Sequence, residues 1–286
     1  MRKTIVWTCL CVLLCGAIAA VAQDMHEPPK VLMIIREQVK PGKNTAHTMN
    51  EAAWSAAYKK AKYETPILAL SSVTGDSEAW FLIGYESFAA AEKDGENMEK
   101  NAALRQINET YGAKEADLLN DSHNIFARYR PDLSYRPGIN VAEYKYFSVT
   151  TARFRLGESV EDFFKVFNGA REKADVDTHI AIYQVVSGGM GGTFIAFTPQ
   201  KSMAEWDTPP NAAFNAALKE ANFSQLVGKA LMNYEGRLYA FSPRMSSPSE
   251  EMIAANPEFW NPKPMMTKKA MGMEKPMPAA KKEMKK

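Results

Sequence analysis

Histidines are the first residues to consider for chemistry in this sequence, because a neutral imidazole binds metal ions and titrates near neutral pH. The body of the chain contains His47, His123 and His179, and His26 lies near the N-terminus. They form no His-x-His or His-x-x-x-His motif, the spacings that place two ligands on one face of a strand or helix. The sequence therefore predicts no metal site, and it leaves His47 and His123 as candidates for catalysis.

Aromatic and cationic side chains supply the remaining candidates. Trp54 and Trp80 could serve catalysis, although large aromatic side chains more commonly fill cores. A cluster of basic and aromatic residues near the end of an expected strand could hold an anionic or aromatic ligand. The ligand-binding candidates are Arg128, Tyr129 and Arg130 of this cluster, together with His179. A solvated strand end on which arginine stems cover apolar surface explains the same pattern.

The sequence excludes several other kinds of site. It has no Gly-x-Ser-x-Gly nucleophile elbow. The glycine-rich run 188–192 lies between two expected strands, whereas a phosphate cradle leads into a helix N-terminus. The only cysteines, Cys9, Cys11 and Cys15, lie within the first 22 residues, so a chain without that segment has no thiolate chemistry and no disulfides.

Residues 1–22 have the composition of an export signal. Arg2 and Lys3 precede a mostly apolar stretch that ends in Ala-Val-Ala at 20–22, the small-x-small pattern of signal peptidase sites. Cleavage leaves Gln23 as the new N-terminus of a periplasmic or extracellular protein. No later stretch resembles a transmembrane segment. The alternatives are a retained membrane anchor and lipid attachment at Cys15.

The other end of the chain is rich in lysine and methionine. Residues 262–286 hold eight lysines, two glutamates and six methionines, a composition that predicts disorder from about residue 262. This tail carries +6 and residues 2 and 3 carry +2 of a total of +2, so residues 23–261 carry −6. An acidic body argues against nucleic-acid binding, and a basic tail suits an anionic envelope surface. The methionines also suit Cu(I), but no histidine or cysteine accompanies them.

The candidate residues lie in a part of the chain whose sequence pattern occurs twice. Gly42 corresponds to Gly157, Phe81 to Phe194 and Pro131 to Pro243, and the offset drifts only from 115 to 112 residues. A period this long indicates two duplicated units rather than a solenoid, whose repeats are about 20 to 50 residues long. Each unit reads strand, helix, strand, strand, helix, strand.

The first helix of each unit is expected to pack one apolar face on a sheet. In the second unit Ser159 caps a helix that aligns Phe163, Phe164 and Phe167. In the first unit the helix begins near Asn44 or Thr45, and its expected buried side consists of Ala46, Met49, Ala53, Ala56 and Ala57.

The strands indicate how the two units meet. Short turn-rich segments at 74–77 and 187–192 predict a hairpin in each unit, and helical crossovers around the hairpin give the ferredoxin-like arrangement. Stretches such as 67–70 and 180–186 are apolar on both faces, so a second sheet must cover the face that the helices leave open. With a strand that runs into a serine-capped turn at 84–92 and again at 198–205, this order resembles the dimeric α/β-barrel superfamily.

The resemblance spans about 215 residues and implies a fold rather than an activity. Members of the superfamily include small monooxygenases, haem-handling enzymes, lactone isomerases and proteins without known activity. Some haem-degrading members use an Asn, Trp and His set, and this chain holds Asn50, Trp54, Trp80 and His123 at spacings that do not map onto that set.

The sequence thus predicts an α+β protein of two tandem ferredoxin-like units, packed sheet to sheet as an intramolecular α/β barrel. The expected divisions are a signal peptide (1–22), two repeats (23–138 and 139–248) and a C-terminal extension (249–286). The expected function is that of an exported, soluble protein that binds a small apolar or aromatic molecule or acts as an interaction module, with no cofactor. The alternative is a monooxygenase-like or haem-related enzyme that uses the pocket between sheet and helices.

Overall fold

The computed structural model describes residues 27–209 and 211–262. The expected signal peptide and nearly all of the expected disordered tail lie outside these residues. Among the helices that are described, none combines the length and the apolar character that crossing a membrane requires.

The first repeat contains four strands and three helices. In chain order they are β1 (Val31–Val39), α1 (Asn44–Lys60), β2 (Leu68–Ser72), β3 (Glu78–Tyr85), α2 (Phe88–Lys100), α3 (Ala102–Glu115) and β4 (Leu119–Tyr129). The second repeat has the same order after a short 3-10 helix, η1 (Val141–Glu143). Its elements are β5 (Tyr146–Phe154), α4 (Val160–Lys173), β6 (Ala181–Ser187), β7 (Thr193–Gln200), η2 (Met203–Asp207), α5 (Ala212–Glu220), α6 (Phe223–Ala230) and β8 (Leu231–Phe241).

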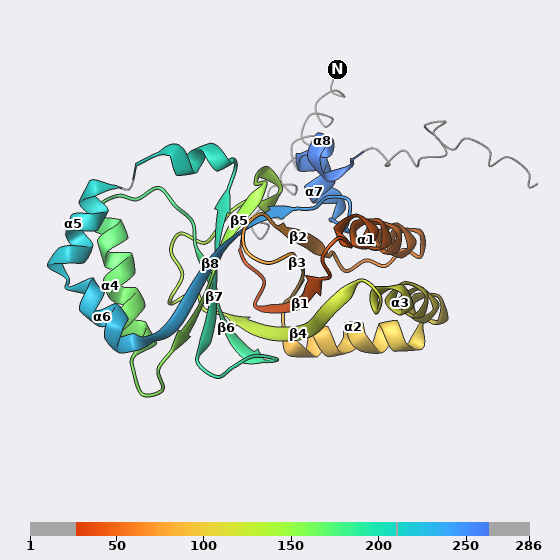
Figure 1. Cartoon of the computed structure of the whole chain (residues 1–286), viewed down its shortest axis with the longest axis horizontal. Helices are drawn as coiled ribbons and strands as arrows, with labels where there is room; N and C mark the ends of the chain where they lie inside the picture. The colour runs from red at the N-terminus through yellow and green to blue at the C-terminus, as the bar shows by residue number, and fades with distance from the viewer. Residues whose placement is uncertain (1–26, 210, 263–286) are drawn as a thin grey trace, which may run out of the picture.

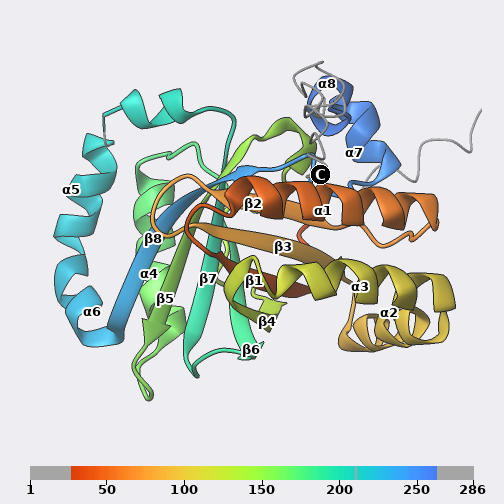
Figure 2. The same cartoon turned by 45° about the vertical axis from the view of Figure 1, so that its right-hand side comes forward.

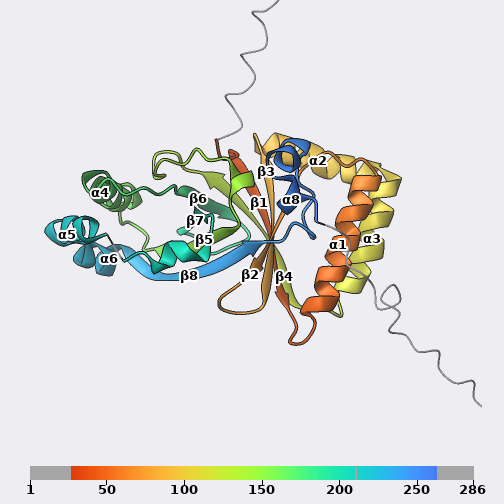
Figure 3. The ribbon, with the colours of Figure 1, turned by 90° about the horizontal axis from the view of Figure 1, so that it is seen from above.

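The eight strands form one closed barrel, in the order β1-β3-β2-β8-β5-β7-β6-β4. Each repeat contributes four neighbouring strands, and the two seams between the repeats are equivalent. At one seam Leu70 of β2 pairs with Phe241 of β8, and at the other Tyr183 of β6 pairs with Tyr129 of β4. The helices of the two repeats lie on opposite sides of the barrel (Figures 1 and 3). The predicted α+β barrel of two ferredoxin-like units is confirmed.

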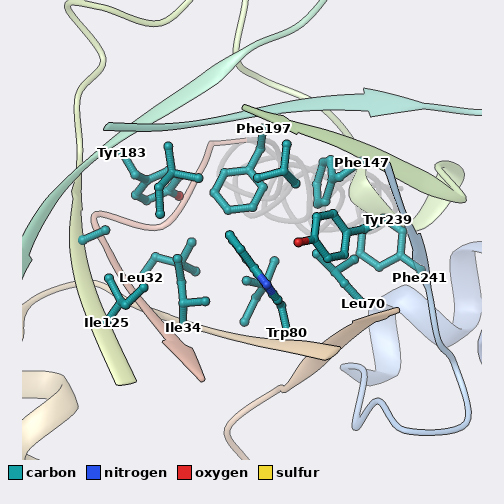
Figure 4. Packing of buried hydrophobic residues seen from close by; sticks show 14 of the residues in the cluster. Leu32, Ile34, Leu70, Trp80, Ile125, Phe147, Tyr183, Phe197, Tyr239 and Phe241 are labelled. Carbon is teal, nitrogen blue, oxygen red and sulfur yellow. The ribbon is translucent and has the colours of Figure 1, made fainter. Parts of the chain in front are cut away.

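Large apolar side chains from both repeats fill the barrel interior (Figure 4). Trp80 lies against Tyr239 with 5.2 Å between ring centroids, and Phe147 lies 4.9 Å from Phe241. The interior is therefore a packed core. It also explains why the strands read as apolar on both faces, since each sheet has the barrel core on one side and helices on the other.

A buried ionic cluster lies at one end of the barrel interior. The carboxylate of Glu78, 6% exposed, lies 2.7 Å from Arg36 Nη2 and 3.1 Å from Arg237 Nη1. Trp80 Nε1 and Tyr239 Oη donate hydrogen bonds to its other oxygen at 3.1 and 2.9 Å. Every oxygen of this carboxylate thus has a charged or polar partner, as a buried ion requires.

Helix α1 buries a different face from the one that its alanines predict. Ala46, Met49, Ala53 and Ala56 are exposed, and the buried side consists of His47, Asn50, Glu51 and Tyr58. The prediction for α1 is therefore wrong. In α4 the prediction is confirmed for Phe163 and Phe164, which are both buried.

A C-terminal extension packs on the barrel and beside η1, and a groove separates it from the exposed side of α1 (Figure 2). It consists of α7 (Glu250–Ala255) and α8 (Pro257–Trp260). Trp260 is 2% exposed, lies edge-on to Phe241 and donates a hydrogen bond from Nε1 to the carbonyl of Ala142 at 3.1 Å. The extension thus contributes a core residue.

Candidate functional site

The first repeat contains a cavity of about 780 Å³ between the outer face of its sheet and helices α1, α2 and α3. Most of its wall is apolar or aromatic, and the aromatic lining residues are Trp54, Tyr58, Tyr63, Phe81, Tyr85 and Phe126. A volume of this size and character falls in the range of small-molecule sites.

Hydrogen bonds fix several of these aromatic side chains. Tyr63 and Tyr85 both donate to Asp94 Oδ2, at 2.6 and 2.9 Å. Trp54 and Tyr58 donate to Asn108 Oδ1 on α3. Burial raises the pKa of Tyr58 to about 12, so its hydroxyl stays protonated at neutral pH. The polar groups thus hold the aromatic wall in place.

A cluster of polar residues lies at one end of the layer between the sheet and the helices of the first repeat. Glu37 comes from β1, His47 and Glu51 lie four residues apart on α1, and Glu115 ends α3. Their exposed fractions are between 2% and 7%. His47 Nε2 lies 2.8 Å from Glu37 Oε2, and one ligand atom from each of the four residues lies within 4.8 Å of the others. Glu37 and Glu51 also line the cavity.

The electrostatics of this cluster are unusual. Burial raises the pKa of Glu37, and burial together with the nearby Glu115 raises the pKa of Glu51 well above its usual range. No lysine or arginine of the described residues forms an ion pair with these carboxylates. Asn50 Nδ2 donates to Glu115 Oε1 at 2.9 Å, while Glu115 Oε2 and Asn50 Oδ1 are buried without a hydrogen-bond partner.

The corresponding layer of the second repeat is filled with phenylalanine. Phe154, Phe163, Phe164 and Phe194 pack together between the sheet and α4, with ring centroids 5.1 to 5.9 Å apart. The strand bulges next to Val39 and Phe154 align the two repeats and place Ala152 where the first repeat has Glu37. Within residues 27–209 and 211–262, this cavity and its polar cluster therefore lie in the first repeat, and the same layer of the second repeat is packed with phenylalanine.

The predicted catalytic candidates do not come together. His47 lies in the polar cluster and Trp54 lines the cavity, but Trp80 is in the barrel interior on the other face of the sheet. His123 lies within β4, half-exposed, with Nδ1 3.3 Å from Asp121. The set of Asn50, Trp54, Trp80 and His123 is thus divided between separate places.

The predicted ligand-binding candidates are also separated. The Arg128 guanidinium lies over the exposed ring of Phe88, while Tyr129 faces the barrel interior. Arg130 pairs with Asp132 and Glu161, both at 2.6 Å. His179 Nδ1 donates a hydrogen bond to the carbonyl of Arg136, and the side chain lines a smaller apolar pocket, of about 270 Å³, at the mouth of the barrel.

Sequence reasoning missed Glu37, Glu51 and Glu115. The spacing of His47 and Glu51, four residues apart, places both on one helix face, but a search for histidine pairs does not find it. Glu37 interrupts an apolar strand, and that is a further signal. Glu115 carries no local signal, because only the tertiary fold brings the end of α3 beside α1.

No protein-family profile matches the sequence, and no curated protein matches it. Solved structures do match. An anthrone oxidase-like protein has a TM-score of 0.50 and 12% identity, over 77% of this chain and 92% of its own. A candidate monooxygenase of Fusobacterium nucleatum has a TM-score of 0.49 and 12% identity, over 75% and 93%. A mutant chlorite dismutase of Candidatus Nitrospira defluvii has a TM-score of 0.46 and 8% identity, over 80% and 96%.

This chain has the dimeric α/β-barrel fold. The strand order and the two equivalent seams carry that assignment, together with the likeness to the anthrone oxidase-like protein. At such low identity the likeness shows the fold and leaves the activity open.

The described residues do not fit haem in the cavity of this dimeric α/β barrel. No histidine of the described residues lines the cavity. A histidine is the usual axial ligand in haem proteins of several classes.

Proposed function

We propose that the first repeat binds a small, mainly aromatic or apolar molecule in the cavity between its sheet and helices α1, α2 and α3. The difference between the repeats carries this proposal: the second repeat fills the same layer with phenylalanine, so the fold does not require a cavity there. A concave space of this size with a mainly apolar wall is typical of small-molecule sites.

Gly95 offers a way to test the proposal. It lies on α2 at the cavity wall, and a Cβ atom built there meets no atom within 4 Å. We expect Gly95→Phe to fill the cavity and to lower the affinity for a probe such as 2-naphthol at least tenfold without unfolding the protein. Gly169→Phe on α4 is the matched control, because Gly169 also has open space and lies outside this cavity.

Two measurements test the proposal. Native mass spectrometry of protein purified from its own source detects a retained molecule, and isothermal titration calorimetry measures the affinity for 2-naphthol. A retained small molecule that Gly95→Phe loses and Gly169→Phe keeps supports the proposal. Equal binding by both variants, or no binding by the parent protein, contradicts it.

Catalysis on the bound molecule is the second candidate function. Glu37 and Glu51 are carboxyls with raised pKa values at the cavity wall, and such groups are suited to proton transfer. One structurally similar protein is described as anthrone oxidase-like and another as a candidate monooxygenase. A suitable assay is therefore oxygen uptake with anthrone as the substrate. Uptake that depends on the protein and is lost in Gly95→Phe supports an enzyme. Uptake unchanged by Gly95→Phe argues against this cavity as its site.

We also propose that the protein acts outside the cytoplasm, on the basis of residues 1–22 and the basic tail. The exported protein is expected to begin at Gln23. Intact-mass analysis checks this expectation, and a mass that still includes residues 1–22 or a lipid on Cys15 contradicts it. Salt-sensitive binding to anionic vesicles, lost when residues 263–286 are removed, tests the role of the tail.

A further inference from the structure

We propose that Glu37, His47, Glu51 and Glu115 bind one divalent transition-metal cation of the Mn²⁺, Fe²⁺ or Zn²⁺ class. The proposal is independent of the cavity ligand, since none of the four groups is needed for an aromatic molecule to occupy the apolar wall.

The geometry is close to that of a metal site. Atoms that bind the same ion at 2.0 to 2.2 Å lie at most about 4.4 Å apart. The four ligand atoms already lie within 4.8 Å of one another, so each needs to move inward by less than about 1 Å to bind one ion. Three different elements supply these ligand atoms. Strand β1 provides Glu37, α1 provides His47 and Glu51, and α3 provides Glu115.

The charge balance of the ionised carboxylates favours a cation. Three carboxylates are buried side by side, and among the described residues His47 is the one basic group in contact with any of them. Burying unpaired carboxylates is strongly unfavourable. In contrast, the buried Glu78 in the barrel has two arginines and two hydrogen-bond donors. A divalent cation would supply the cluster with positive charge, as the two arginines do for Glu78.

Two unpartnered atoms point independently to a ligand. Glu115 Oε2 and Asn50 Oδ1 are buried without a hydrogen-bond partner, in side chains that are 7% and 8% exposed. Native structures leave few such atoms. The other atoms of these two residues are already fixed, because Asn50 Nδ2 donates to Glu115 Oε1 and to the carbonyl of Tyr111. Asn50 would therefore orient Glu115 as a neighbour of the metal.

The ligand set indicates the class of metal. A single imidazole with three carboxylates suits Mn²⁺, Fe²⁺ and Zn²⁺, whereas Cu(I) prefers thiolate or thioether sulfur and Ca²⁺ takes six to eight oxygens. Because Glu37 and Glu51 also line the cavity, the cation would lie at the cavity wall.

The test measures metal directly. Full-length protein is stripped with EDTA, dialysed and titrated with Zn²⁺ and with Mn²⁺ by calorimetry, and bound metal is counted by elemental analysis. We expect one equivalent to bind, and at least a hundredfold loss of affinity in Glu51→Gln and in His47→Gln. Glu92→Gln and His123→Gln are the matched controls, since Glu92 is exposed on α2 and His123 is half-exposed on β4. Both controls should bind like the parent.

A second measurement covers variants that fail to fold. Electron-spin-echo spectroscopy of Mn²⁺ bound to the unmodified protein should show coupling to one imidazole nitrogen. No binding of either metal by the parent protein overturns the proposal, as does equal affinity in the cluster variants and the controls, or a bound Mn²⁺ without nitrogen coupling. Loss of metal binding with intact 2-naphthol binding, or the reverse, shows which of the two proposals has failed.

Discussion

Two buried glutamates show how the surroundings of one residue type determine its role. Glu78 lies in the barrel between Arg36 and Arg237, whereas Glu51 lies beside another carboxylate, Glu115. Burial raises the pKa of Glu78, but the hydrogen bonds and positive charge of Arg36 outweigh that effect and lower it overall. We therefore assign Glu78 a structural role and Glu51 a role in binding.

Replacing Glu78 should destabilise the barrel. Glu78→Gln keeps the shape of the side chain but leaves two partly buried arginines without their shared counter-charge, which should cost about 3 kcal/mol of unfolding free energy. Urea denaturation measures this loss. Glu235→Gln is the control, because Glu235 pairs with the same Arg237 but is 58% exposed, and it should change little. Equal losses in the two variants would contradict a buried ionic cluster.

The same carboxylate predicts a pH dependence. The folded pKa of Glu78 is below its unfolded value of about 4.5, so its contribution is fully present above that pH and is lost as the pH falls through the folded pKa. The difference in melting temperature between the parent and Glu78→Gln should therefore be large at pH 7 and should shrink below about pH 4. A difference that stays constant down to pH 3 would show that the charge of Glu78 is not responsible.

At the scale of elements, helix faces show what the sequence could predict. Phe163 and Phe164 mark the buried side of α4 correctly, because hydrophobic periodicity dominates where a helix packs on an apolar layer. Periodicity failed for α1, which turns its alanines outward and buries His47, Asn50 and Glu51. A polar buried face cannot be read from apolar spacing, because its energetics depend on Glu37 and Glu115 from other elements.

The short helix α8 makes a prediction at this scale. Trp260→Ala removes a ring that lies against Phe241 and a hydrogen bond to Ala142, and it should cost about 3 kcal/mol. A chain that ends at Pro262 keeps this contact and should melt within about 2 °C of the parent, since the composition of the removed tail predicts little burial. Thermal melting of the two variants compares them directly. A stable Trp260→Ala protein would mean that the extension is not part of the core.

At the scale of the whole molecule, duplication explains both the barrel and its asymmetry. The equivalent seams at Leu70 with Phe241 and at Tyr183 with Tyr129 show that either repeat presents the same two edges to the other. The sequence predicted this arrangement because strands that are apolar on both faces need a packing partner on each face. It could not predict that one outer layer is filled with phenylalanine and the other contains a cavity, since that depends on which side chains meet across the layer.

The closed barrel predicts how half of the chain behaves. Residues 27–138 alone would expose the inner face of four strands and the free edges of β2 and β4, which the second repeat covers in the full chain. Exposed apolar surface and open strand edges favour association. Because the seams are equivalent, β2 of one copy can pair with β4 of another, with Leu70 in the place that faces Tyr129. Light scattering after size-exclusion chromatography should therefore detect a dimer or larger aggregates, and a stable monomer would contradict a single cooperative barrel.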